Sequence, residues 1–396
     1  MSQYLLINRI QVQGANAIAG FTWGFPAITH FLGFVHNLSR KLVRHESFTD
    51  IQLTGCAVIA HQHQVHTYAF NQFVQNRTPA FQYKEQSKYK VGSPPVIEEG
   101  KMNMTVSLLI DYEGNIGHQQ EQLKDWLDNH CPLQHLAGGT ILNIEDITFF
   151  TIDNEQNKGN LRSLIRKLLP GFILLNRPSY LESHFQQLQA KKPEAELFDA
   201  WLDFIALKQK ARPGYQLINR HLIKQTELQP RNEQYQELLS LLQIHLEHPY
   251  SQDDIPDDLK KYFASIADNK TNKQLLQQWQ DYCAPTEKTD AVWEYVKKPE
   301  QGFLVPIMVG YKAISPVYKN HEVANTRDNE TDVCFVEAVH SIGEWQGVHR
   351  IRDDETLKQS MWQYHYENYW YLCKQNIENA NGKDEISLES PDDDFS

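Results

Sequence analysis

The sequence predicts an α+β fold, with strands and helices alternating at both ends of the chain and helices between them. Three observations support this prediction. The first 60 residues have the pattern of strand, glycine-rich loop, helix and strand; residues 101–112 alternate in polarity; and residues 179–290 carry apolar residues at helical spacing. A chain of 396 residues, 41% of them hydrophobic, is long enough for two or three domains with large cores.

The opening unit, residues 4–42, has the clearest pattern. The apolar run Tyr4–Val12 predicts a strand, and Gly14, Gly20, Gly24 and Pro26 then interrupt regular structure. The long loop that these residues predict contains two aromatic side chains, and loops of this length are usually functional. The residues that follow at helical spacing predict a helix with one buried stripe: Ile28, Phe31, Leu32, Val35, Leu38 and Leu42.

Residues 51–64 predict a second strand after this helix. Strand, helix and strand together form half of the ferredoxin-like, RRM-type arrangement that many RNA-recognition domains use. His61 and His63 would share one face of the second strand. Two interpretations of this pair remain open, a metal site and a polar cluster at the end of a strand.

The charge of the opening stretch is one-sided. Residues 1–45 contain no Asp or Glu, although the whole chain has 50 acidic and 38 basic residues. An acid-free surface of this size suits a bound polyanion, and the alternative is a solvated helix face. The net charge of −12 opposes nucleic-acid binding. However, residues 377–396 contain seven acids and one lysine, which predicts a disordered acidic tail that carries half of the excess.

Residues 67–97 are aromatic, basic and rich in turn formers. Phe81, Tyr83, Lys84, Lys88 and Tyr89 lie close together in this stretch. Aromatic rings interleaved with Lys and Arg can stack on bases and contact phosphates of single-stranded RNA. The equally supported alternative is a twisted hairpin with ordinary surface lysines.

A second basic block follows the central strand. Residues 101–112 predict a strand and residues 119–129 a short helix, and the pair Gly138–Gly139 permits close backbone approach. In residues 160–178, an apolar stripe predicts a helix whose other side carries Arg162, Arg166 and Lys167. No acid occurs between residues 156 and 181. This block is therefore a further candidate for phosphate contact.

The rest of the chain divides into three parts. Residues 179–290 predict an α-helical insertion with an acidic segment at residues 253–258. Strands return in residues 291–376, where Tyr311, Arg327, His349 and Arg350 are types that contact RNA. A salt bridge to a neighbouring acid is the alternative for Arg327. We expect a final aromatic helix at residues 356–373.

Several sequence blocks resemble one protein family. GANAI, FTWGFP and GFVH near the start, LAGGTIL at residues 136–142, the basic block ending in LPGF, and the later GFLVPIMVGY and EVANTRDNE occur in the family's order. They resemble the second Csy subunit of type I-F CRISPR surveillance complexes, the f-subtype of the Cas-five group of RAMP proteins. The resemblance covers roughly residues 1–60, 97–178 and 292–352.

The resemblance implies a RAMP core divided between residues 1–178 and 291–376, with a thumb-like β-hairpin near residues 67–97. It also implies a non-catalytic subunit that grips the five-prime handle of the guide RNA and docks the large subunit, in a complex that also contains a backbone filament subunit and target DNA. The residues that we assign to RNA contact are Asn16, Trp23, His36, Arg40, Arg44, Gly138, Gly139, Arg162, Arg166, Lys167, Tyr311, Arg327, His349 and Arg350.

Two other functions remain open. A metal-independent RAMP endoribonuclease would use His36 or His349 as general base. A subunit of a minimal complex would use its helical insertion in place of a large subunit to recognise DNA. We expect no metal, no cofactor and no membrane partner. Five scattered cysteines without C-x-x-C spacing predict a cytoplasmic protein.

Overall fold

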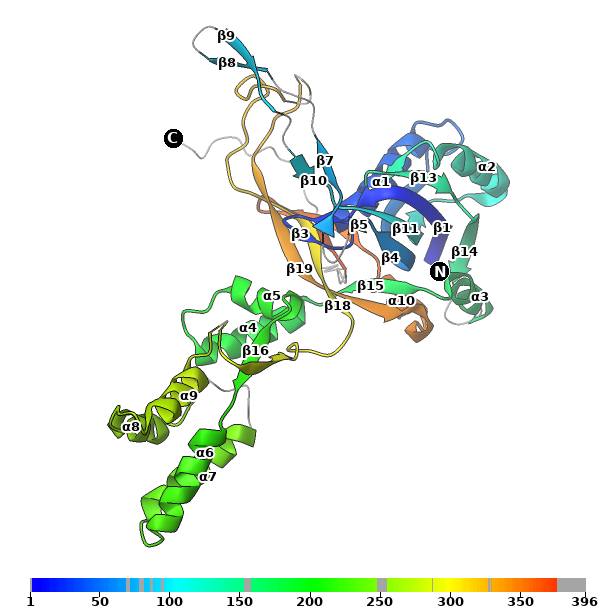
Figure 1. Cartoon of the computed structure of the whole chain (residues 1–396). Helices are drawn as coiled ribbons and strands as arrows, with labels where there is room; N and C mark the ends of the chain where they lie inside the picture. Colours follow the sequence, from blue (N-terminus) through cyan, green and yellow to red (C-terminus); the bar gives the residue numbers. More distant parts are fainter. Residues whose placement is uncertain are drawn as a thin grey trace. The chain divides into compact units, whose positions relative to one another are not determined.

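The computed structural model describes residues 2–68, 72–77, 82–85, 88–93, 96–152, 158–247, 255–286, 288–326, 328 and 330–375. The chain forms two compact units (Figure 1). Unit 1 comprises residues 1–204 and 300–396, and unit 2 comprises residues 205–299. Helices and antiparallel strands are both abundant, so the predicted mixture of the two is confirmed.

Long antiparallel strands form the centre of unit 1, in the order β13, β1, β11 and β4. Strand β14 also pairs with β1. The predicted strands at residues 4–12, 51–64 and 101–112 are therefore confirmed and lie side by side (Figure 1). The strands are β1 (Ser2–Asn16), β4 (Gln52–Val65), β11 (Lys101–Glu113), β12 (His135–Leu136), β13 (Gly139–Asn143) and β14 (Asp146–Ile152).

Helices cover both faces of this sheet. Leu5 and Ile7 of β1 point into a core shared with α1 and α2, while Tyr4 and Leu6 point into a second core under α3. Because successive strand residues face opposite sides, a strand covered on both faces is apolar throughout. The predicted stripe of the first helix is buried. The helices are α1 (Ile28–Val43), the short η1 (Gly117–Gln119), α2 (Gln120–His130) and α3 (Lys158–Leu168).

The sheet continues from β4 and curls back towards it. Beyond β4 the order is β15, β19, β18, β21 and β20. Just before β20, Trp362 exchanges two backbone hydrogen bonds with Cys56 of β4, at 2.8 and 3.0 Å. The elements are β15 (Phe172–Asn176), α4 (Pro178–Lys191), α5 (Leu197–Ile205), β18 (Leu304–Ala313), β19 (Val336–Gly347), η3 (Val348–Arg350), α10 (Asp354–Lys358), β20 (Gln363–Glu367) and β21 (Trp370–Lys374).

The predicted helix at residues 356–373 is wrong. Helix α10 ends at Lys358, and the aromatic residues beyond it form the hairpin β20–β21. Asn368 and Tyr369, between the two strands, both have positive φ, of 50° and 64°. Two such residues make the type I′ turn that joins antiparallel strands with the correct twist. The alternation of Tyr364 and Tyr366 was the strand signal in this stretch.

Short antiparallel pairs occupy the described part of residues 67–97. Strand β5 pairs with β6, β7 with β10, and β8 with β9. Other residues of this stretch, including Phe81, lie outside the described residues. The strands are β5 (Thr67–Tyr68), β6 (Gln72–Phe73), β7 (Gln75–Arg77), β8 (Gln82–Glu85), β9 (Lys88–Val91) and β10 (Val96–Glu98). The short hairpin β2 (Ile18–Ala19) and β3 (Thr22–Trp23) lies in the stretch predicted as a loop.

Unit 2 is built from helices around its own core, which includes Leu222, Leu242, Phe263 and Trp279. Its first and last strands, β16 and β17, pair antiparallel. Helices α4 and α5, which also lie in residues 179–290, belong to unit 1. The elements of unit 2 are β16 (Gln209–Pro213), α6 (Gln216–Leu228), α7 (Glu233–Glu247), α8 (Asp257–Ser265), α9 (Lys273–Cys283) and β17 (Ala291–Tyr295).

Candidate nucleic-acid interface

An aromatic pocket of about 600 Å³ opens on unit 1. Trp23, Phe172 and Phe303 stand at its rim with 37%, 53% and 67% of their surfaces exposed, and Phe25 and Trp345 contribute further rings. The described residues that line it are Ala17, Trp23, Gly24, Phe25, Ala60, His61, Gln62, His63, Val65, Met102, Phe172, Phe303, Val305 and Trp345. This set contains no carboxylate and no Lys or Arg. Flat, partly exposed rings of this kind are the surfaces on which unstacked bases bind.

The predicted loop residue Trp23 reaches the pocket through the hairpin β2–β3. Gly20, with φ +66°, makes the turn of this hairpin. The Trp23 ring lies directly against Gly100, where a Cβ atom would overlap it. Phe21 packs on Trp201 and His340, with ring centroids 5.6 and 4.4 Å apart. The stretch predicted as a long loop is therefore a short hairpin that packs on unit 1 and places Trp23 at the rim.

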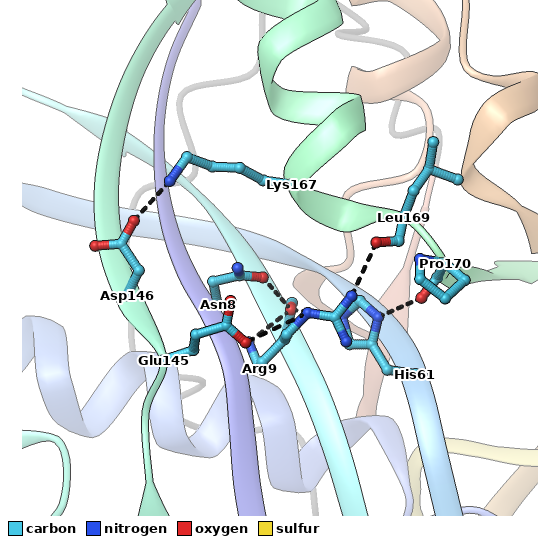
Figure 2. A network of polar contacts seen from close by, with 9 residues as sticks. Asn8, Arg9, His61, Glu145, Asp146, Lys167, Leu169 and Pro170 are labelled. Carbon is cyan, nitrogen blue, oxygen red and sulfur yellow. Dashed lines mark hydrogen bonds and ion pairs between the residues drawn. The ribbon is translucent and has the colours of Figure 1, made fainter.

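A polar network fixes His61 in the pocket wall (Figure 2). Its Nδ1 donates to the carbonyl of Pro170 at 2.7 Å, because a carbonyl oxygen can only accept. Its Nε2 lies 2.7 Å from Ser107 Oγ, and that hydroxyl also reaches Asn8 Oδ1 at 2.9 Å. Burial lowers the pKa of His61, so the ring favours its neutral form. His61 is thus a fixed, uncharged wall of the pocket, and His63 contributes a second imidazole.

Arg9 supports this network from a bulge in β1. The register of β1 against β11 shifts between Ile7 and Ile10, and Arg9 has φ 48°. Its backbone N–H donates to Ser107 Oγ at 2.9 Å, and its guanidinium donates to the Leu169 carbonyl at 2.9 Å (Figure 2). The Nε atom lies 3.5 Å from a Glu145 carboxylate oxygen. Arg9, the first basic residue of the acid-free opening, therefore makes contacts within the chain.

Basic side chains gather on two elements that adjoin the start of β15, α3 and η3. Phe172, at the rim, pairs with Gly347, the last residue of β19. The next turn, η3, carries His349 and Arg350, both exposed, and it packs on α3 through the second core of unit 1. Arg162 and Arg166 are exposed on α3. The structure therefore brings together four of the predicted RNA-contact residues on two neighbouring elements.

Lys167 has a different environment from its predicted neighbours. Its Nζ lies 2.6 Å from Asp146 Oδ2 (Figure 2), and Lys124 lies 3.3 Å from Oδ1 of the same carboxylate. Burial alone would raise the pKa of Asp146, but hydrogen bonds from Lys167, Thr148 and Lys124 outweigh it and hold this pKa well below its usual range. Lys167 therefore fastens α3 to β14.

Other predicted residues have local structural environments. Gly138 and Ala137, with φ +75° and 52°, form the two-residue turn between β12 and β13. At Gly139 a Cβ would lie 2.7 Å from backbone atoms of β1, so only glycine fits there. The backbone N–H of Asn16 donates a hydrogen bond to the Ala137 carbonyl of the same turn, at 2.8 Å. Arg327 lies outside the described residues.

The remaining predicted residues lie on α1 and β18. His36, Arg40 and Arg44 are exposed on α1, and the His36 ring lies 6.2 Å from that of Tyr364. Tyr311 is half-buried on β18. None of these four residues lines the aromatic pocket. Two of them adjoin a different surface of unit 1, the tyrosine-bearing face of β18, β21 and β20: His36 contacts Tyr364, and Tyr311 pairs with Tyr371.

Sequence reasoning missed most of the pocket. Phe25, Phe172 and Phe303 come from three distant segments, and each follows a glycine in the sequence. This Gly-Phe repetition was the available signal. Within the described ranges, no group of three or more His, Cys, Asp or Glu side chains is placed to hold a metal ion. Nor is any described helix both long and apolar enough to span a membrane.

Comparison with known proteins gives the family. The model of the CRISPR-associated protein family Cas_Csy2 matches residues 5–216 and 207–373. The CRISPR-associated protein Csy2 of Pseudomonas aeruginosa (strain UCBPP-PA14) is 30% identical over 377 residues, which cover 92% of this chain and 91% of that protein. These matches confirm the resemblance to the second Csy subunit. The chain therefore belongs to the Csy2 family of CRISPR-associated proteins.

Proposed function

We propose that this chain is a non-catalytic, RNA-binding subunit of a type I-F CRISPR effector complex and that it grips the five-prime handle of the guide RNA. The aromatic pocket is the observation that carries this proposal. Its rim offers three exposed rings, and its described lining has no carboxylate that would repel phosphate. Exposed arginines of α3 and η3 adjoin the start of β15, the strand that carries the rim residue Phe172. Bases splayed out of a single strand would stack in the pocket, and the arginines would neutralise neighbouring phosphates.

We propose further that the core is a ferredoxin-like RAMP domain. The strand order β13, β1, β11 and β4 supports this, since all neighbours are antiparallel. Helix α1 connects β1 to β4 and α2 connects β11 to β13, as in two interleaved βαβ units. This arrangement gives one continuous sheet that can position the ends of β4 and β15 beside the RNA.

The proposed partners are the guide RNA, the large subunit, the backbone filament subunit and, within the complex, target DNA, all in the cytoplasm. Family membership supports a multi-subunit assembly. Unit 2 carries the acidic residues Asp257 and Asp258 at the start of α8. Lys260 and Lys261 pair with these carboxylates at 3.2 and 3.6 Å, so the start of α8 offers no excess positive charge to a phosphate backbone. We therefore assign unit 2 to protein contact with the large or filament subunit.

The proposal includes the absence of nuclease activity. His36 contacts Tyr364, and the His349 ring lies where a side chain at Gly347 would be. A general base needs a second group placed across the scissile phosphate. Purified protein incubated with labelled repeat RNA, with and without magnesium, should leave the RNA intact. A discrete product that disappears in His36→Ala or His349→Ala would establish the endoribonuclease instead.

Binding is tested by titrating the full chain with repeat-derived RNA that carries the five-prime handle and with a scrambled RNA of equal length. We expect preference for the handle RNA. We also expect Phe303→Leu to weaken binding about tenfold, because stacking on one ring contributes about 1–3 kcal/mol. The matched control is Phe335→Leu, another exposed phenylalanine of unit 1 that does not line the pocket. Equal affinity for both RNAs would refute the proposal.

A further inference from the structure

Three tyrosines form a row across the C-terminal part of the sheet. Tyr311 of β18 lies directly opposite Tyr371 of β21, which lies opposite Tyr366 of β20. Residues directly opposite each other on neighbouring strands project from the same face of a sheet. Tyr364 adjoins the row, with its ring centroid 4.9 Å from that of Tyr371. The tyrosine row is therefore a continuous aromatic strip, separate from the aromatic pocket.

The row becomes more exposed towards the edge strand. Tyr311 is half-buried and packs with the core residues Ala19 and Ala27. Tyr371 is 38% exposed, and Tyr366, on the edge strand β20, is 64% exposed. The rings of Tyr364 and Tyr371 pack at 4.9 Å between centroids, and this contact holds the middle of the strip. Two rings are thus held in place with accessible surfaces.

Acidic side chains of β19 and β20 lie on the face of the sheet opposite the tyrosine row. Glu367 lies opposite Trp370, and Glu337 opposite Lys312, so both acids project from the face opposite the row. Lys312 itself lies 4.8 Å from the Trp370 ring. The acids of these paired strands are therefore placed away from the row.

Helix α1 adjoins the row at His36. The His36 ring is 6.2 Å from that of Tyr364, and the exposed Arg40 follows one helical turn later. Tyrosine rings near an exposed arginine, with no acid among the paired residues of the face, complement a single-stranded polyanion better than they complement a protein.

We propose that the tyrosine row is a second RNA contact, on which unpaired bases stack against Tyr366 and Tyr371 while Arg40 approaches a phosphate. This inference rests on the proposed function and extends it to a surface away from the pocket. It also gives Tyr311, His36 and Arg40 a common role, since the first anchors the row and the other two lie on the helix that adjoins it.

The test uses the full chain and handle RNA. Tyr366→Leu and Tyr371→Leu should each weaken binding about tenfold, because a stacking ring is lost. Tyr366→Phe should bind like the original chain, because its ring remains. Trp370→Leu, on the opposite face of the same hairpin, is the matched control and should leave affinity unchanged. Thermal midpoints of all variants verify that each one folds.

A second measurement does not depend on substitution. After photo-crosslinking to handle RNA, trypsin should release the peptide Gln359–Lys374 with a nucleotide attached, since the chain has no Lys or Arg between these cleavage sites. Absence of a cross-link in this peptide, with unchanged binding by Tyr366→Leu, overturns the inference. If Phe303→Leu still weakens binding in that case, the proposed function holds without the second RNA contact. If the original chain shows no preference for handle RNA, the proposed function and the second RNA contact both fail. Loss of a co-purifying subunit with RNA affinity intact makes the row a protein interface.

Discussion

Gly138 and Gly139, at the β12–β13 turn, differ in how much space they leave for a side chain. A Cβ at Gly138 would meet no atom within 4 Å, so Gly138→Ala carries only the strain of φ +75°, about 1 kcal/mol. At Gly139 a Cβ would press against backbone atoms of β1, and we expect Gly139→Ala to cost about 3 kcal/mol. Urea unfolding of both variants measures the difference. Equal midpoints would show that β13 can move away from β1.

Histidine burial predicts a pH dependence of stability. Burial lowers the pKa of His61 and of His30, so the folded chain binds fewer protons than the unfolded chain below about pH 6.5. Stability should therefore be complete above that pH and decline as the pH falls through the lowered values. Urea midpoints at pH 7.5 and 5.5 test this. The decline should be smaller in His61→Gln, and an unchanged decline would exclude His61 as a contributor.

Neighbouring basic residues of α3 should have separable effects. Arg166 is exposed, so Arg166→Gln should weaken RNA binding and reduce the log–log salt slope by about 0.7, the contribution of one phosphate on a single strand. Lys167 bonds to Asp146, so Lys167→Gln should instead lower stability by about 1 kcal/mol. Salt titration and urea unfolding on both variants distinguish the two roles. The assignment fails if Lys167→Gln alone changes the salt slope.

At the scale of elements, the pattern of apolar residues predicted those helices and strands that bury a regular set of side chains. Strands β1 and β4 could be predicted from apolar runs, and β11 and α1 from apolar residues that recur at strand and helix spacing. The hairpin β20–β21 was missed because residues 356–373 are aromatic throughout, which hides the period.

The candidate site was predictable only in part, for a related reason. Trp23 stood out because it follows several glycines, and the basic side of α3 stood out by composition. The pocket itself joins β3, β4, β15 and the ends of β18 and β19, and this meeting depends on long-range strand pairing. Lys167 and Arg166 were indistinguishable in sequence, because the carboxylate that holds Lys167 comes from a separate strand.

At the scale of the whole molecule, unit 2 should be separable from unit 1. Val296 donates a backbone hydrogen bond to Lys208 at 2.9 Å, so the first and last segments of unit 2 are neighbours. A short Gly/Ser linker can therefore replace residues 209–295. We expect this variant to keep handle-RNA affinity, because the pocket lies wholly in unit 1, and to lose partner co-purification. Lost RNA affinity with the partner still bound would contradict the assignment of unit 2 to protein contact.

The aromatic pocket also has a consequence for synthesis on the ribosome. Its lining begins at Ala17 and ends at Trp345, and the sheet around it returns to β4 only at Trp362. The first lining residue therefore emerges more than three hundred residues before the last. Before Trp345 is synthesised, part of the pocket lining is missing, so a prematurely terminated chain cannot form the complete pocket. Guide RNA would accordingly be captured by finished chains, and truncated products would be excluded from assembly without a separate quality-control step.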